Sequence, residues 1–119
     1  MNVSRGSLLG LVLLILAISG ASTWWGQRQE AALGREVAAL AGPGDLQMLS
    51  SDTCGICTLA RGWFVQHGVA FAECSIERDA ACRARFDALQ AQGTPVILVR
   101  GQPELGFSPQ RLKLRLAAG

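Results

Sequence analysis

The feature that most restricts how this chain can fold is an uncharged segment near its N-terminus. The twenty residues SLLGLVLLILAISGASTWWG, Ser7 to Gly26, contain no Asp, Glu, Lys or Arg. In a helix that rises about 1.5 Å per residue, this length spans the roughly 30 Å hydrocarbon core of a bilayer. Trp24 and Trp25 lie near its end, as aromatic side chains do at the headgroup boundary. We therefore expect residues 1–26 to be a membrane anchor or a signal segment.

The stretch from Leu8 to Ile18 also has the length of a signal-peptide core, and Ser19-Gly20-Ala21 is an acceptable cleavage site. We disfavour a buried core helix, because the rest of the chain is too small to surround a helix that is apolar on every face. The uncharged length favours an uncleaved anchor. Because the segment is built like a secretory signal, we expect the domain to be extracytoplasmic (periplasmic), with cleavage and secretion as the alternative.

Residues 27–44 predict a helical stalk or linker, and residues 45–119 predict a single small domain. Leu33, Val37 and Leu40 are spaced to share one helix face, and the GPGD that follows ends the helix. The formal net charge is only +2 and the basic residues are scattered, which argues against a nucleic-acid partner.

The hydrophobic pattern of the domain predicts an α/β fold with the order strand, helix, strand, helix, strand, strand, helix. In the second helix, Ala81, Phe86 and Leu89 are expected to face inward, with Gly93 ending it. A strand–helix–strand unit implies parallel pairing with a right-handed crossover. The expected ranges are 46–50, 54–67, 69–76, 77–93, 95–101, 104–106 and 109–118.

Cys54-Gly55-Ile56-Cys57 lies where the first domain helix is expected to begin, and three kinds of chemistry fit such a pair. A structural zinc site needs four ligands, and Cys74, Cys82 and the one histidine, His67, supply no second closely spaced pair. A purely structural disulfide across so short a loop removes little unfolded-state entropy. A redox centre is therefore favoured, and no metal is expected.

A redox role assigns different tasks to the two cysteines. Cys54 lies near the unpaired N–H groups of the first helical turn, which favour a thiolate, so it is expected to be the exposed nucleophile. Cys57, one turn further on, is expected to be the more buried thiol that resolves the mixed disulfide. Asp52 is acidic and close, and is expected to oppose thiolate formation in part.

Two further motifs carry little information when taken alone. Thr94-Pro95 opens the apolar stretch PVILV, where a proline can simply start a strand. GFSPQRL, Gly106 to Leu112, fits a loop that enters a helix.

Together these motifs resemble the thioredoxin superfamily, and specifically its small glutaredoxin-like branch. The CxxC, the Thr-Pro and Gly-Phe-x-Pro-x-Arg-Leu follow in the family's order, and the last is similar to the C-terminal motif of redoxins that reduce ribonucleotide reductase. The resemblance covers about residues 45–117. It implies a glutaredoxin-like βαβαββα sheet with flanking helices and a cis peptide before Pro95. It also implies a substrate-binding surface at Thr94, Pro95, Gly106 and Phe107.

The chain also departs from this family. Gly55 and Ile56 replace the usual proline and tyrosine, and Ser51-Asp52-Thr53 stands where glutaredoxins tend to carry a lysine. Leu105-Gly106-Phe107-Ser108 replaces a Gly-Gly-x-Asp element that helps to hold glutathione. These departures weaken the case for glutathione, so we expect no cofactor beyond the redox-active disulfide. An exported domain would not meet ribonucleotide reductase.

Cys74 and Cys82 lie outside the family motifs. They fit two buried small side chains, a redox relay with the CxxC, or a second disulfide between the second strand and the next helix. We favour the disulfide, because an oxidising compartment permits it.

These observations predict an enzyme, a membrane-tethered thiol–disulfide oxidoreductase that acts on exported proteins or small thiols through Cys54 and Cys57. Its expected partners are protein or small-molecule thiols and disulfides, an upstream electron donor or acceptor, and the membrane. The alternatives are a metal-handling module and a redox-inactive adaptor of the same fold.

Overall fold

The computed structural model describes residues 3–119, which divide into a first unit that ends at Ala32 and a second, Leu33–Gly119. Helix α1 (Arg5–Leu40) makes up the first unit and contributes its last turns to the second. The large apolar side chains from Leu8 to Ile18 are 49–63% exposed. By length and composition α1 is able to cross a membrane, a test that a signal sequence near the N-terminus also passes.

The second unit is built on a four-stranded sheet of order β2-β1-β3-β4. β1 pairs in parallel with β2, whereas the β1–β3 and β3–β4 pairs are antiparallel. The predicted order of elements and the parallel strand–helix–strand unit are therefore confirmed. The elements are β1 (Leu46–Ser50), α2 (Gly55–His67), β2 (Ala72–Ser75), α3 (Ala80–Ala88), β3 (Val96–Val99), β4 (Gln102–Leu105) and α4 (Pro109–Ala117).

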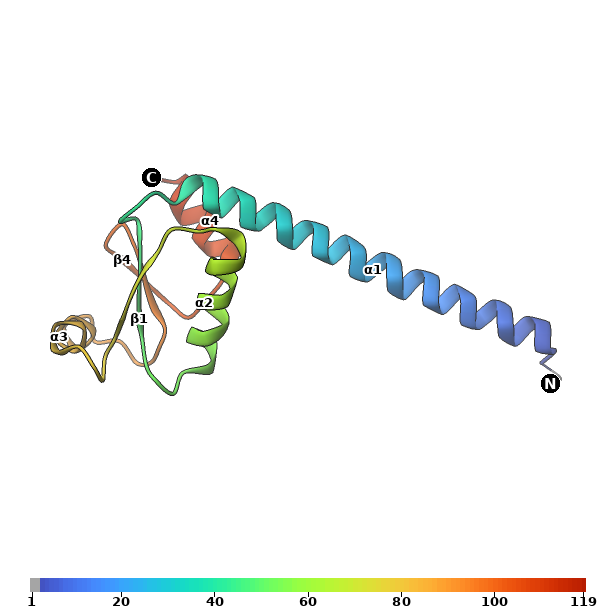
Figure 1. Cartoon of the computed structure of the whole chain (residues 1–119), viewed down its shortest axis with the longest axis horizontal. Helices are drawn as coiled ribbons and strands as arrows, with labels where there is room; N and C mark the ends of the chain where they lie inside the picture. Colours follow the sequence, from blue (N-terminus) through green and yellow to red (C-terminus); the bar gives the residue numbers. More distant parts are fainter. Residues whose placement is uncertain (1–2) are drawn as a thin grey trace. The chain divides into compact units, whose positions relative to one another are not determined.

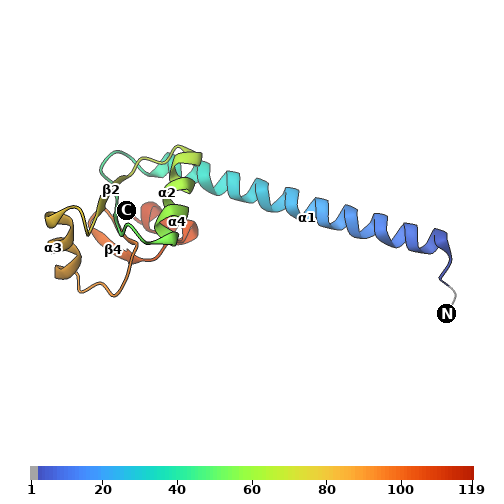
Figure 2. The same cartoon turned by 60° about the horizontal axis from the view of Figure 1, so that its bottom comes forward.

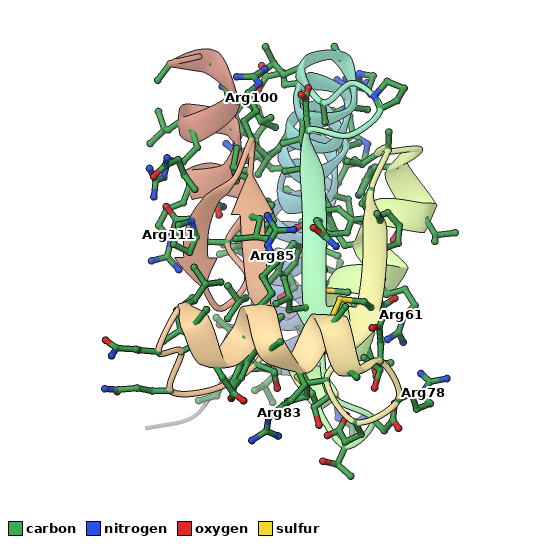
Figure 3. The ribbon with its side chains drawn as sticks, turned by 90° about the vertical axis from the view of Figure 1, so that its left-hand side faces the viewer. Arg61, Arg78, Arg83, Arg85, Arg100 and Arg111 are labelled. Carbon is green, nitrogen blue, oxygen red and sulfur yellow. A yellow bond between two sulfur atoms is a disulfide. The ribbon has the colours of Figure 1, made fainter. Side chains whose placement is uncertain are left out.

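The helices of this unit cover both faces of the sheet (Figures 1 and 2). α2 and α4 lie on one face, and α3 crosses the strands on the other (Figure 3). Each face buries its own apolar cluster. One is centred on Phe64, Met48 and Ile97, and the other on Leu49 and Leu98. Two cores on opposite faces leave the ends of the strands uncovered, which is where a site can form.

The last turns of α1 belong to the larger core. Val37 is fully buried and Ala41 nearly so, and Leu33 and Leu40 pack against the same cluster. The predicted apolar stripe is therefore present. The end of α1 thus packs with the sheet and its helices, in the compact unit that runs from Leu33 to Gly119.

Helix α3 differs most from its sequence-based prediction. Asp79 caps it by accepting hydrogen bonds from the N–H groups of Ala81 and Cys82, so the helix begins three residues later than expected. Gln90 adopts a left-handed φ of 54° and the helix ends before it, not at Gly93. Cys82 is buried, whereas Ala81 is exposed, because the capped start fixes which face meets the sheet.

Candidate functional site

Cys54 and Cys57 lie where β1 runs into α2. Cys54 takes the N-cap position of α2, with an extended backbone. Its Sγ accepts a hydrogen bond from the Cys57 backbone N–H, at 3.0 Å. That N–H is one of the first donors of the helix, which have no partner within it. The two cysteines form a disulfide, with their Cα atoms 5.2 Å apart.

The two cysteines differ in burial. Cys57 is fully buried in the first turn of α2, whereas Cys54 is partly exposed. An incoming sulfur can therefore reach Cys54 and not Cys57. Ile56, between them, is 52% exposed, so the apolar rim of the site faces solvent.

Strand register brings the Thr94-Pro95 peptide to the same end of the sheet. Leu49 pairs with Val96, so Pro95 lies across from Ser50, just before the turn that leads to the CxxC. The peptide bond between Thr94 and Pro95 is cis, as the resemblance implied. Pro95 is buried and Thr94 is partly exposed beside the site.

Gly106 and Phe107, the other predicted substrate-binding residues, have different surroundings. Gly106 adopts a φ of 85°, a region that favours glycine, and donates its N–H to the Pro95 carbonyl at 2.8 Å. The structure thus brings Gly106 to the CxxC end of the sheet. The Phe107 ring instead packs edge-on against Trp63 and Phe64, with centroids 5.7 and 5.5 Å away. Phe107 is therefore chiefly a core contact.

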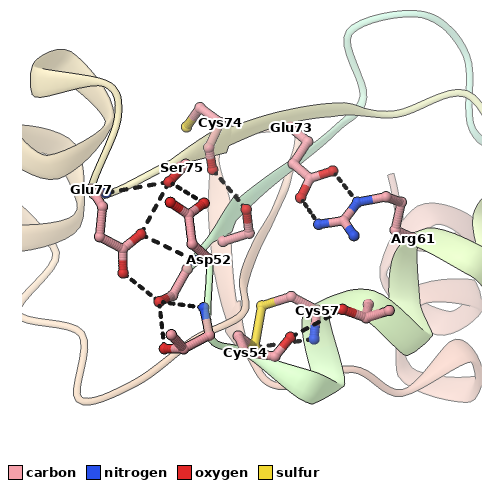
Figure 4. The surroundings of a disulfide bond; sticks show 12 residues. Asp52, Cys54, Cys57, Arg61, Glu73, Cys74, Ser75 and Glu77 are labelled. Carbon is pink, nitrogen blue, oxygen red and sulfur yellow. Dashed lines mark hydrogen bonds and ion pairs between the residues drawn. A yellow bond between two sulfur atoms is a disulfide. The ribbon is translucent and has the colours of Figure 1, made fainter.

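A polar network ties the turn before the CxxC to the segment after β2 (Figure 4). The Glu77 carboxylate accepts hydrogen bonds from the Ser51 hydroxyl and from the Asp52 backbone N–H, the latter at 3.1 Å. The Ser75 hydroxyl lies 3.0 Å from carboxylate oxygens of both Asp52 and Glu77. Arg78 donates to the Asp52 carboxylate at 3.0 Å.

These hydrogen bonds act on the protonation of Glu77. The Ser51 hydroxyl, followed by the Asp52 amide and the Ser75 hydroxyl, holds the pKa of Glu77 below its usual value. Hydrogen bonds to the ionised carboxylate favour that form. Glu77 therefore carries a negative charge beside this turn at neutral pH.

A second carboxylate is paired along α2. Arg61 makes a two-pronged contact with Glu73 of β2, in which Nε lies 2.7 Å from Oε1 (Figure 4). The Arg61 hydrogen bonds hold the pKa of Glu73 below its usual value, and Glu73 in turn raises the pKa of Arg61. The Arg61–Glu73 pair links α2 to β2, an edge strand of the sheet.

Cys74 and Cys82 form the second disulfide, with Cα atoms 6.0 Å apart. They lie in the cluster under α3, together with Leu49 and Leu98, whereas Cys57 lies on the α2 face. The sheet separates the two disulfides. This placement does not favour direct thiol exchange between them, the relay considered from the sequence.

Sequence reasoning missed Ser75, Glu77 and Arg78. The available signal was the charged run Glu77-Arg78-Asp79 directly after the strand expected at 69–76, which was to pair in parallel with the strand before the CxxC. Carboxyl ends of parallel strands meet at one edge of a sheet. Within residues 3–119, three or more His, Cys, Asp or Glu side chains nowhere converge as a metal site would require.

Comparison with known proteins places the fold. No protein-family model matches the chain, and no curated protein matches it significantly. Among solved structures, a mutant of the thioredoxin-like protein BC3987 matches with a TM-score of 0.56 and 22% identity, covering 64% of this chain and 99% of that one. Mutated buckwheat glutaredoxin matches with a TM-score of 0.51 and 14% identity, covering 77% and 94%.

A glutaredoxin from Archaeoglobus fulgidus matches with a TM-score of 0.50 and 20% identity, covering 63% of this chain and 87% of the other. Each of the three is spanned nearly from end to end, by a match to about two thirds to three quarters of this chain. The chain therefore has the glutaredoxin-like form of the thioredoxin fold, as its motifs indicated.

Proposed function

We propose that this protein is a thiol–disulfide oxidoreductase, tethered to a membrane by α1, that acts on exported proteins or small thiols. The observation that carries the proposal is the asymmetry of the CxxC. Cys54 is accessible at the start of α2, while Cys57 is buried one turn further on. Attack and release need these two roles in one site.

The exchange balances with the two cysteines alone. The Cys54 thiolate attacks a substrate disulfide, forming a Cys54–substrate bond and releasing one substrate sulfur as a thiolate, which takes up a proton. The Cys57 thiolate then attacks the Cys54 sulfur, closing the disulfide and releasing the second substrate thiol. Two electrons pass from the protein to the substrate, and oxidation of a substrate runs the same steps in reverse.

Backbone donors support the attacking sulfur. The Cys57 N–H already points at Cys54 Sγ, and this donor is stronger toward a thiolate than toward a disulfide sulfur. Thr94, Pro95 and Gly106, at the same end of the sheet, are proposed as the surface that receives the substrate beside Cys54. No cofactor is needed beyond the disulfide, and we propose that glutathione is not bound as one.

The N-terminal unit supports the proposed anchor. Trp24 and Trp25 lie in α1 at the end of its apolar stretch, and the Arg28 guanidinium lies 4.1 Å from the Trp24 ring centroid. An aromatic side chain with a neighbouring cation suits the headgroup boundary. We propose that the domain lies on the extracytoplasmic side.

Insulin reduction by the full chain in mild detergent tests the proposal. The wild type should catalyse turnover with a dithiol reductant. Cys54→Ser should abolish turnover, whereas Cys57→Ser should abolish turnover but trap a mixed disulfide with the substrate. Absence of turnover with several reductants would support the redox-inactive adaptor. Stoichiometric zinc or copper in protein purified reduced would support the metal-handling module.

A further inference from the structure

The turn before the CxxC is held by a segment that a second disulfide closes. Four contacts reach residues 51 and 52 from Ser75, Glu77 and Arg78. The backbone adds a fifth link, because the Ile76 N–H donates to the Ser50 carbonyl at 2.9 Å. All of these partners lie between Cys74 and Cys82.

The Cys74–Cys82 bond restricts where this segment can lie. Cys74 is in β2, which is paired with β1, and Cys82 is buried in the first turn of α3. Within the loop, the Asp79 N–H donates to the Ser75 carbonyl at 3.0 Å, and Asp79 also caps α3. A covalently closed loop of this size has few alternative conformations. Opening the bond would free Glu77 to leave the turn.

We propose that Glu77, held in place by the Cys74–Cys82 disulfide, is a positioning residue that sets the reactivity of Cys54. The inference rests on the proposed function only in taking Cys54 as the attacking thiol. Glu77 acts on Cys54 from the preceding turn, where it accepts hydrogen bonds from the Asp52 N–H and the Ser51 hydroxyl.

The charges around the turn decide the sign of the effect. Asp52 is paired with Arg78. Glu73 of β2 is paired with Arg61 of α2 (Figure 4). Glu77 therefore supplies the negative charge that these cations do not offset. A carboxylate near a thiol disfavours the thiolate. In largely aqueous surroundings, a unit charge several ångströms from a thiol shifts the pKa of that thiol by about half a unit.

The second disulfide then becomes a redox control on the first. A dithiol reductant would convert Cys74–Cys82 to two thiols, with two electrons and two protons gained by the protein and one disulfide formed in the reductant. The loop would open, and the contribution of Glu77 at Cys54 would be lost. The two cysteine pairs would thus communicate without exchanging sulfur bonds.

The pKa of the Cys54 thiol tests this directly, in the full chain with Cys57→Ser so that Cys54 is free. It is read from the pH dependence of iodoacetamide alkylation. Glu77→Gln should lower this pKa by about half a unit. The matched control is Asp87→Asn, which removes an exposed carboxylate that pairs with Arg83 on α3, away from the turn, and should leave the pKa unchanged.

The same substitution is then made with Cys74→Ser and Cys82→Ser added. Glu77→Gln should now have less than half of its original effect, because the loop no longer holds residue 77 in place. An equal effect in both backgrounds, or no effect in the first, overturns the proposal. Alkylation needs no turnover, so these results stand apart from the outcome of the insulin assay.

A second measurement does not require the Cys74→Ser, Cys82→Ser protein to fold. In a Cys54→Ser, Cys57→Ser protein only the Cys74–Cys82 disulfide remains. Amide hydrogen exchange is then measured at the Asp52 N–H, which donates a hydrogen bond to the Glu77 carboxylate. Reduction with a dithiol should accelerate its exchange at least tenfold, and Glu77→Ala should do the same with the disulfide closed. The Gly106 amide, bonded to Pro95, should stay protected. Unchanged exchange at Asp52, or loss of protection at Gly106 as well, contradicts a local positioning role.

Discussion

At the scale of single residues, Gly34 shows how a missing side chain shapes the domain. His67 packs its imidazole on the Gly34 backbone, where a Cβ would overlap the ring. The ring also lies 4.6 Å from the Trp63 ring, centroid to centroid. The close approach of α1 and α2 therefore depends on glycine at this position.

Gly34→Ala should lower the free energy of unfolding by about 1 kcal/mol, since an overpacking cost of about 1–3 kcal/mol exceeds the helix-propensity gain of about 1 kcal/mol. Gly62→Ala in α2, where a Cβ meets nothing within 4 Å, should instead stabilise by about 0.5–1 kcal/mol. Denaturation of the full chain in mild detergent, followed by near-UV circular dichroism, measures both. An increase in stability on Gly34→Ala would contradict the close packing of His67 on Gly34. Adding His67→Ala to Gly34→Ala should remove the cost of the overlap between the new Cβ and the ring.

The Arg61–Glu73 pair predicts a pH dependence. The folded-state pKa of Glu73 is lowered, chiefly by the Arg61 hydrogen bonds, so the pair stabilises above the unfolded carboxyl value of about 4.3. This contribution disappears as the pH falls through the lowered folded pKa. Glu73→Gln should lower the free energy of unfolding by about 0.5 kcal/mol at pH 7 and should leave it unchanged at the acidic end of the range. Denaturation from pH 7 to 2.5 tests this, and a cost independent of pH would exclude an ionic contribution.

At the scale of elements, the end of α1 is part of the glutaredoxin-like unit. Val37→Ala should destabilise the protein by about 2 kcal/mol, because Val37 is completely buried in the core. Val65→Ala on α2 is the matched control, since Val65 is 70% exposed and its loss should change stability by less than about 0.5 kcal/mol. Both are measured by the same denaturation experiment. Equal effects would mean that α1 does not contribute to this core.

The elements that the sequence predicted well are those with strong local signals. The expected ranges 54–67 and 109–118 agree with α2 and α4 to within one residue, because Gly68 ends α2 in a left-handed conformation and Ser108 with Pro109 opens α4. Helix α3 was misjudged because its helical pattern runs on past its actual end. Asp79 and Gln90 set its bounds through backbone geometry that the hydrophobic pattern does not encode.

The site was predictable to the same extent. The contrast between a partly exposed Cys54 and a buried Cys57 follows from their spacing of three residues and a helix start, which are local features. The contacts of Glu77 with residues 51 and 52 join positions about 25 apart in the chain, through the parallel pairing of β1 and β2. Which side chains meet across such a pairing depends on register, and the sequence-based prediction started β2 three residues too early.

At the scale of the whole molecule, the disulfides and the apolar helix constrain each other. Two disulfides persist in an oxidising compartment, whereas cytosolic thiols are kept reduced. An apolar N-terminal helix is what would deliver a domain to such a compartment. A protein of this composition with its domain in the cytosol would keep four thiols, and the Cys74–Cys82 loop that holds Glu77 would stay open.

We therefore expect the domain of the full chain to be exported and to remain attached to the membrane. In spheroplasts of a bacterial expression host, a membrane-impermeant reductant followed by an impermeant maleimide should label Cys54, and Cys54→Ser should lose that label. Without the reductant, labelling should stay low, because both pairs are oxidised. The protein should sediment with membranes after an alkaline wash, whereas a version beginning at Gln27 should not. Labelling only after lysis would place the domain in the cytosol, where the Cys74–Cys82 disulfide would not be expected to persist.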